Sequence, residues 1–160
     1  MNTDLYAMGM RARNAIYSCF FLLGFLGLAW IPRIPEIKDS LNLSDGQFGL
    51  VLLASTVGSI PGAQIAGRAV HSFSSKLVVR IAGALLPVGV FVIGIADSVQ
   101  ILLLGLFIIG FNVAFMDIAI NGQAVEIEKH TKGRWMSSFH GFWSIGAFAA
   151  TLVGGLIANF

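Results

Sequence analysis

The stretch Ile101–Gly146, ILLLGLFIIGFNVAFMDIAINGQAVEIEKHTKGRWMSSFHGFWSIG, decides the fold class because polar side chains interrupt two long apolar segments. The first segment, Ile101–Ala124, predicts a membrane-spanning helix, since about 20 apolar residues cross a bilayer. A basic turn, Lys129–Arg134, separates it from a second apolar segment that begins at Met136. Polar side chains in such helices are costly in lipid and usually face a bundle interior or a water-filled pathway. We therefore expect the functional site in this stretch.

The overall composition is that of an integral membrane protein. Hydrophobic residues make up 56% of the 160 residues and charged residues only 11%, whereas soluble proteins carry about 25% charged residues. The formal net charge is +2, and the basic residues are confined to short segments, so membrane lipid is the expected partner and no nucleic acid is indicated. The single cysteine, Cys19, is expected to be a small buried residue.

Five apolar segments predict an all-α integral membrane protein with a single transmembrane domain over residues 1–160. The expected spans are about 15–34, 45–66, 77–95, 101–124 and 136–160. Arg33–Ser44 is expected to be a polar connection between the first two spans. Ser44 and Gln47 have the spacing of a capping box, in which each side chain bonds the other residue's backbone amide. The second span is therefore expected to start near Asp45.

Small residues at helical spacing predict close contacts between the spans, because backbones approach where side chains are short. Three such faces occur, on the first, second and fifth spans. They comprise Gly24, Gly27 and Ala29, then Gly58, Gly62 and Ala66, and finally Gly146, Ala150 and Gly154.

The distribution of Lys and Arg predicts the orientation. If the N-terminus is cytoplasmic, eight basic residues lie inside and two, Arg33 and Lys38, lie outside. Cytoplasmic loops carry such an excess. We therefore expect a multi-pass protein of the cell's inner (plasma) membrane, with Asp39, Asp97 and Phe160 outside. The inside set is Arg11, Arg13, Arg68, Lys76, Arg80, Lys129, Lys132 and Arg134.

The polar residues of the fourth span fall on two nearly opposite faces when each residue turns by about 100°. We expect this helix in the middle of the bundle, with one face on other helices and one on water or substrate. One face holds Asn112, Met116, Ala119, Gln123 and Glu126, and the other holds Gly110, Ala114, Asp117 and Asn121. A polar face of the fifth span holds His140, Ser144, Ala147 and Thr151.

Each polar candidate also has a purely structural interpretation. His140 can contact substrate or only hydrogen-bond the fourth span, and amide side chains can simply join helices. Glu126 can belong to a surface ion-pair cluster. The candidates for a substrate pathway or for proton coupling are Asp117, Asn121, Gln123, Glu126, His140, Ser144, Asn112 and Gln64. The cytoplasmic charge cluster is Glu128, Lys129, Lys132 and Arg134.

The order of these features carries a family resemblance. A polar head is followed by a span ending in W-x-P-R-x-P (30–35), a capped second span, a basic link, a third span and a polar fourth span. This order resembles the N-terminal half of a major facilitator superfamily transporter. The patterns Asp117-x-x-x-Asn121-x-Gln123-x-x-Glu126 and His140-Gly141-Phe142-x-Ser144-x-Gly146 are similar to its sugar-permease-like branch. The resemblance covers all 160 residues and implies five transmembrane helices of an N-terminal six-helix bundle.

The chain departs from that family in two ways. The loop signature G-x-x-x-D-R-x-G-R-R, aligned from Gly67, has His71 at the acid and Ser72 at the arginine, and only Lys76 keeps one of the final basic pair. A gating role for this loop is therefore not expected. Such transporters also have twelve spans, so we expect a fragment or a truncated product without the C-terminal half of the transporter.

Two functions of different class follow. The resemblance implies secondary active transport of a small polar solute, a sugar or related metabolite, coupled to protons and working by alternating access in the full-length protein. A membrane-embedded carboxylate such as Asp117 or Glu126 can carry the proton, because hydration and neighbours shift its protonation. The alternative is a non-transporting membrane-embedded partner, sensor or assembly intermediate. Seven further spans encoded downstream would favour transport, and a stop codon would favour the alternative.

The motifs give no support to catalysis. The three histidines lack H-E-x-x-H spacing, and neither G-x-S-x-G nor G-x-x-x-x-G-K occurs. We expect no enzyme activity, no catalytic residue, no metal and no cofactor.

Overall fold

A computed structural model describes the backbone of residues 3–157 and the side chains of residues 9–157. Over this range the chain is helical, without strands. The elements are α1 (Thr3–Leu28), a 3₁₀ turn η1 (Ile31–Arg33), α2 (Ile34–Ser40), α3 (Asp45–Ser72), α4 (Ser75–Gly94), α5 (Val99–Thr131) and α6 (Met136–Ile157). Five helices in this range are long and apolar enough to cross a membrane, which confirms the expected all-α class with five spans. The expected end of the fifth span, 158–160, lies outside the described residues.

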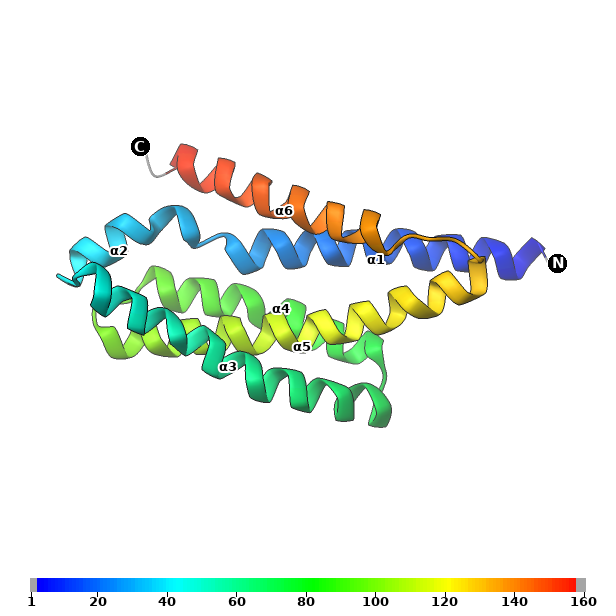
Figure 1. The fold of residues 1–160 in the computed structure, drawn as a ribbon, viewed down its shortest axis with the longest axis horizontal. Helices are drawn as coiled ribbons and strands as arrows, with labels where there is room; N and C mark the ends of the chain where they lie inside the picture. Colours follow the sequence, from blue (N-terminus) through cyan, green and yellow to red (C-terminus); the bar gives the residue numbers. More distant parts are fainter. Residues whose placement is uncertain (1–2, 158–160) are drawn as a thin grey trace.

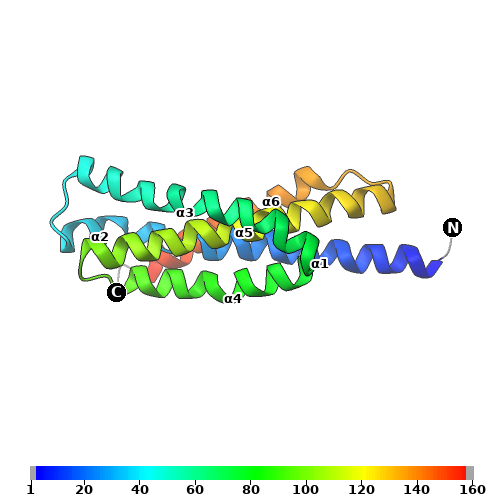
Figure 2. The same cartoon turned by 90° about the horizontal axis from the view of Figure 1, so that it is seen from below.

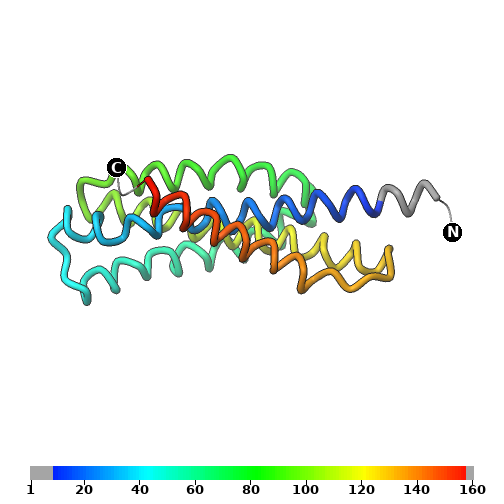
Figure 3. Tube along the Cα trace, turned by 90° about the horizontal axis from the view of Figure 1, so that it is seen from above, coloured from blue at the N-terminus to red at the C-terminus, as the bar shows by residue number. Residues whose placement is uncertain are grey.

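Helix α5 lies in the middle of the bundle. It packs along α3 and α4 and also contacts α1, whereas α6 packs mainly against α1. Figure 1 shows α6 beside α1 on one side and α3, α4 and α5 together on the other. The same arrangement is visible from below, where α5 lies between α3 and α4 (Figure 2), and from above, where α6 crosses α1 obliquely (Figure 3). The central position expected for the fourth span is confirmed.

Glycines make both main helix crossings close. A Cβ added to Gly58 would lie 2.3 Å from the carbonyl oxygen of Phe107, and one added to Gly110 would lie 1.9 Å from that of Ser55, so α3 and α5 pack backbone to backbone. Gly24 and Gly146 do the same where α1 crosses α6, since their added Cβ atoms would each lie 2.1 Å from a carbonyl oxygen. These contacts confirm the small-residue faces predicted on all three helices.

The helix ends differ in part from the prediction. The capping box is present: Gln47 N donates to Ser44 Oγ at 3.3 Å, and Ser44 N donates to Gln47 Oε1 at 2.9 Å. Arg33–Ser44, however, is not an open connection, because η1 and α2 occupy most of it. A proline is the second residue of each short helix, within the first turn, where the backbone N–H has no partner inside the helix and its absence costs little. An Arg33–Glu36 ion pair at 2.5 Å spans their junction.

The basic segments lie together at one end of the molecule. The N-terminal part of α1, the link between α3 and α4 and the link between α5 and α6 are at the same end, whereas α2 and the link between α4 and α5 are at the other (Figure 1). The segments with the eight basic residues expected inside are thus at the opposite end of the molecule from Arg33 and Lys38, which are expected outside.

Candidate functional site

Asp117 and Asn121 form a hydrogen-bonded pair on one face of α5. The Asn121 side-chain amide donates to Asp117 Oδ1 and to the Asp117 carbonyl oxygen, each at 2.9 Å. Both residues are half-buried. Residues four apart lie one above the other on a helix, so the predicted stripe already places them together. The carboxylate keeps its second oxygen, which accepts no hydrogen bond from the described part of the chain.

His140 brings α6 to the same place. Its exposed imidazole interacts electrostatically with the Asp117 carboxylate, and its ring packs edge-on against buried Phe20 of α1, with centroids 5.0 Å apart. Ser144 lies one turn further along α6, and its hydroxyl donates to the His140 carbonyl oxygen at 3.2 Å, so it can only accept from a solute. Helices α5 and α6 therefore approach each other at Asp117 and His140, with α1 against the histidine ring, and of the predicted residues Asp117, Asn121 and His140 are brought together.

A small cavity of about 280 Å³ lies along the same face of α5, toward the end of the bundle that carries α2. Its α5 wall includes Gly110 and Ala114, which precede Asp117 on the predicted stripe. The opposite walls come from the end of α1 and from α3, which contributes three hydroxyl groups. These belong to Ser55, Thr56 and Ser59.

Sequence reasoning missed these hydroxyl residues. Ser55 Oγ donates to the Leu52 carbonyl oxygen and Ser59 Oγ to that of Thr56, both at 2.8 Å, so their oxygens remain able to accept from a solute. The signal was available, because Ser55 and Ser59 are four residues apart and share one face of α3.

On the other face of α5, Gln123 joins this helix to α4. Gln123 Nε2 donates to Ser75 Oγ of α4 at 3.0 Å. Asn112 is 2% exposed, and its amide donates to the Ile108 carbonyl oxygen at 2.8 Å, while its Oδ1 has no hydrogen-bond partner within the described structure. Gln64 is exposed on α3 and does not line the cavity beside Asp117. None of these three amides joins the Asp117 group.

The acidic residues at the end of α5 have separate roles. Exposed Glu126 pairs with Lys129 at 3.5 Å and lies 3.4 Å from His130 Nδ1, as a surface ion pair would. Glu128 instead accepts hydrogen bonds from the backbone amides of Trp135 and Met136, the latter at 2.8 Å, and so caps the start of α6. Lys132 adopts a left-handed conformation, φ 54°, that lets the chain turn, and Arg134 is exposed.

Aromatic contacts tie α1 to α6 near this cap. The Arg13 guanidinium lies over the Trp135 ring, 4.7 Å from its centroid. The hydroxyl groups of Tyr17 and Ser138 share a hydrogen bond of 2.8 Å. Both contacts join residues more than one hundred positions apart, so no local pattern in the sequence predicts them.

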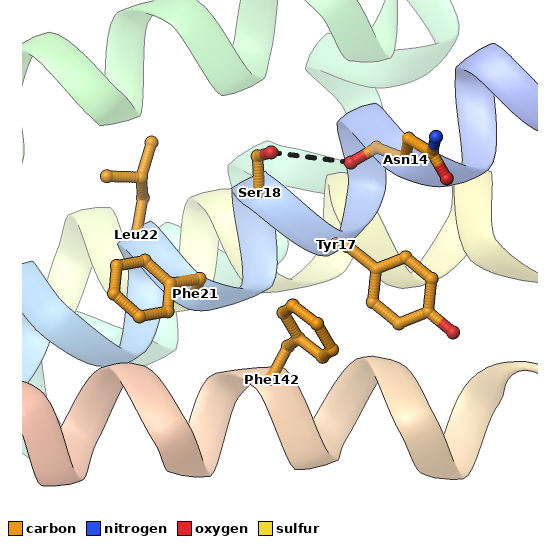
Figure 4. A pocket seen from close by; sticks show the side chains of 6 residues that line it. All are labelled: Asn14, Tyr17, Ser18, Phe21, Leu22 and Phe142. Carbon is orange, nitrogen blue, oxygen red and sulfur yellow. Dashed lines mark hydrogen bonds between the residues drawn. The ribbon is translucent and has the colours of Figure 1, made fainter.

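A larger cavity, of about 500 Å³, lies elsewhere. It opens between α1 and α6 and is lined mainly by Tyr17, Phe21, Leu22 and Phe142, with Ser18 Oγ donating to the Asn14 carbonyl oxygen (Figure 4). Its lining includes no residue of α5, whereas the smaller cavity, whose lining does not include Asp117 either, borders the Asp117 face of α5 at Gly110 and Ala114. We therefore place the candidate site at Asp117 and the smaller cavity. No cluster of three metal-binding side chains occurs among residues whose side chains are described.

Comparison with known proteins identifies the family. The model of the Major Facilitator Superfamily matches residues 15–160, so the chain belongs to this superfamily of membrane transporters. An uncharacterised transporter of Sinorhizobium fredii, y4wD, is 34% identical over 88% of this chain and 37% of its own length. An uncharacterised transporter of Yersinia pestis is 31% identical over 79% of this chain and 33% of its own length.

A third relative is the membrane protein MosC of Rhizobium meliloti, 28% identical over 91% of this chain and 36% of its own length. The chain thus spans about a third of the length of the curated relatives it matches and corresponds to a partial, N-terminal-half-like portion of a transporter. No solved structure matches it significantly.

Proposed function

We propose that this chain is the front part of a secondary active transporter that carries a small polar solute, a sugar or related metabolite, together with protons. Membership of a transporter superfamily supports the general activity. The observation that carries the finer proposal is the Asp117 carboxylate, half-buried on α5, held by Asn121 and facing His140 of α6. An ionisable side chain inside a membrane-spanning helix is costly in free energy, and the ones that occur there usually have a function.

The coupling proton would bind to Asp117. In a narrow site with little water the neutral acid is favoured, and a cation or added water favours the carboxylate. His140 on α6 is the neighbour whose electrostatic interaction with Asp117 can change this balance. A change in the separation of α5 and α6 would therefore load or release the proton.

The solute would lie in the cavity beside Asp117. Ser55, Thr56 and Ser59 on α3 offer hydroxyl oxygens, and the small residues Gly110 and Ala114 on the α5 wall leave room. Hydroxyl and carboxylate groups are the partners that sugar hydroxyls bind. Glu126 is the less favoured proton carrier because it is exposed and already paired with Lys129.

The remaining wall of the site would come from the rest of the longer protein. Alternating access in such folds rocks two repeats about a site near the bilayer midplane, so this portion supplies one side only. The basic end of the bundle would face the cytoplasm of a cell whose inner membrane holds the protein.

The experiment that tests the proposal uses the complete protein in vesicles with an imposed proton gradient. Uptake of radiolabelled sugars is measured with and without the gradient, after a thermal-shift screen has chosen the solutes. Accumulation above the outside concentration, abolished by a protonophore, is expected. A reading frame that stops after residue 160, or binding with no transport, would favour the alternative of a membrane-embedded partner or sensor.

A further inference from the structure

A cleft between α1, α4 and α5 combines two cations with apolar walls. Its volume is about 310 Å³. Lys76 and Arg80 line it from α4, and Ser75 and Gln123, joined by their hydrogen bond, contribute its other polar groups. The apolar part of the lining is Ala12, Ala15, Ile16, Cys19, Val79 and Ile127.

No acidic side chain among residues 9–157 compensates the charge in this cleft. No carboxylate lines it, and neither Lys76 nor Arg80 forms an ion pair with a side chain in the described range. By contrast, Lys129 is paired with Glu126 at the same end of the bundle. Lys76 and Arg80 are four residues apart on α4, so both cations project from one face of the helix.

The depth of the two cations matches that of lipid headgroups. Helix α4 has 20 residues, and at 1.5 Å per residue it is just long enough to cross a hydrocarbon core of about 30 Å. Its first two turns, which carry both cations, therefore lie near the membrane interface. The apolar walls beside Val79 and Ile16 continue from there toward the hydrocarbon.

We propose that this cleft binds an anionic phospholipid, with the headgroup phosphate between Lys76 and Arg80 and part of an acyl chain along α1 and α4. Basic pockets between transmembrane helices on the cytoplasmic side bind acidic headgroups. The bound lipid would join α1 to α4, which share few other contacts, and would do so independently of the transported solute. A free phosphate ion would use the two cations but not the apolar walls.

The test counts lipids bound to the complete detergent-solubilised protein by native mass spectrometry during titration with phosphatidylglycerol. The double variant Lys76→Gln/Arg80→Gln is compared with Arg68→Gln/Lys132→Gln, which removes the same charge from the same end outside the cleft. Since each cation near the surface contributes about 1 kcal/mol, the first variant should weaken the first binding event about thirtyfold. The second variant should change the affinity for the first lipid less than about threefold, and Lys76→Arg/Arg80→Lys should keep the affinity of the unchanged protein.

Three further measurements distinguish a bound phospholipid headgroup from a free phosphate ion. Phosphatidylcholine should bind more weakly than phosphatidylglycerol, and excess inorganic phosphate should not displace the lipid. Cys19, which lines the cleft, should react with maleimide more slowly when phosphatidylglycerol is present. Equal losses in the two double variants, displacement by inorganic phosphate, or a Cys19 that lipid does not protect would each overturn the proposal.

Discussion

Glu128, near the end of α5, accepts a hydrogen bond of 2.8 Å from the backbone amide of Met136, the first residue of α6. The same carboxylate oxygen accepts from the amide of Trp135. The first amides of a helix have no partner within the helix, and a negative charge also suits its positive end. One side chain of α5 therefore satisfies free amides at the start of α6 and links the two helices across the turn.

We expect Glu128→Ala to destabilise the complete protein by about 1 to 2 kcal/mol, the range for loss of a helix cap. Glu128→Gln, which keeps one acceptor oxygen, should cost less. Thermal denaturation in detergent measures both. The matched control is Glu126→Ala, which removes only a surface ion pair and should cost less than about 1 kcal/mol. Equal losses at the two positions would contradict the capping role.

Gly110→Ala should weaken the packing of α3 on α5. Its new Cβ would lie 1.9 Å from the Ser55 carbonyl oxygen, a distance at which the two helices must move apart. We expect a loss of stability of about 1 to 3 kcal/mol, as for other overpacked sites, measured by thermal denaturation. Gly122→Ala on the same helix is the control, because nothing lies within 4 Å of its added Cβ.

The control variant should be stabilised by up to about 1 kcal/mol, since Ala is the better helix former. If Gly110→Ala behaved in the same way as Gly122→Ala, the close crossing of α3 and α5 would be wrong.

Asn112→Leu should leave stability unchanged or raise it. The side chain is 2% exposed, and its Oδ1 has no hydrogen-bond partner among the described groups. Leucine therefore removes a buried polar atom whose desolvation is not offset by a hydrogen bond. The melting temperature and solute uptake should both be retained. A variant that folds but no longer transports would instead assign Asn112 to the pathway, as the sequence analysis allowed.

The sequence predicts those features of the fold that repeat along one helix. Gly58 and Gly62 mark the α3 crossing because small residues at four-residue spacing are visible without a partner. The Asp117–Asn121 bond follows in the same way from its spacing. Glu128 could not be predicted as a cap, because its acceptor oxygen reaches over a turn whose geometry depends on the left-handed Lys132. The part of the site on α3 was missed since serines in a helix bond their own backbone and give no sign of a cavity.

The orientation is testable by single cysteines in a cysteine-free background. Positions 39 and 97 should react with an impermeant maleimide in intact cells, and position 132 should react only after permeabilisation. The basis is the positive-inside excess and the placement of the basic segments at one end of the bundle (Figure 1). Labelling of position 132 from outside, with protection of 39 and 97, would invert the topology.

The most direct measurement compares proton-driven uptake with solute exchange for Asp117→Asn in the complete protein, at equal membrane abundance. Asparagine keeps the shape and much of the hydrogen bonding with Asn121 but cannot titrate. If Asp117 carries the coupling proton, uphill accumulation should fail while exchange, which needs no net proton movement, survives. Asp97→Asn, which removes an exposed carboxyl from the link between α4 and α5, should leave both unchanged. Near-normal accumulation by Asp117→Asn would contradict the account and leave Glu126 as the remaining candidate.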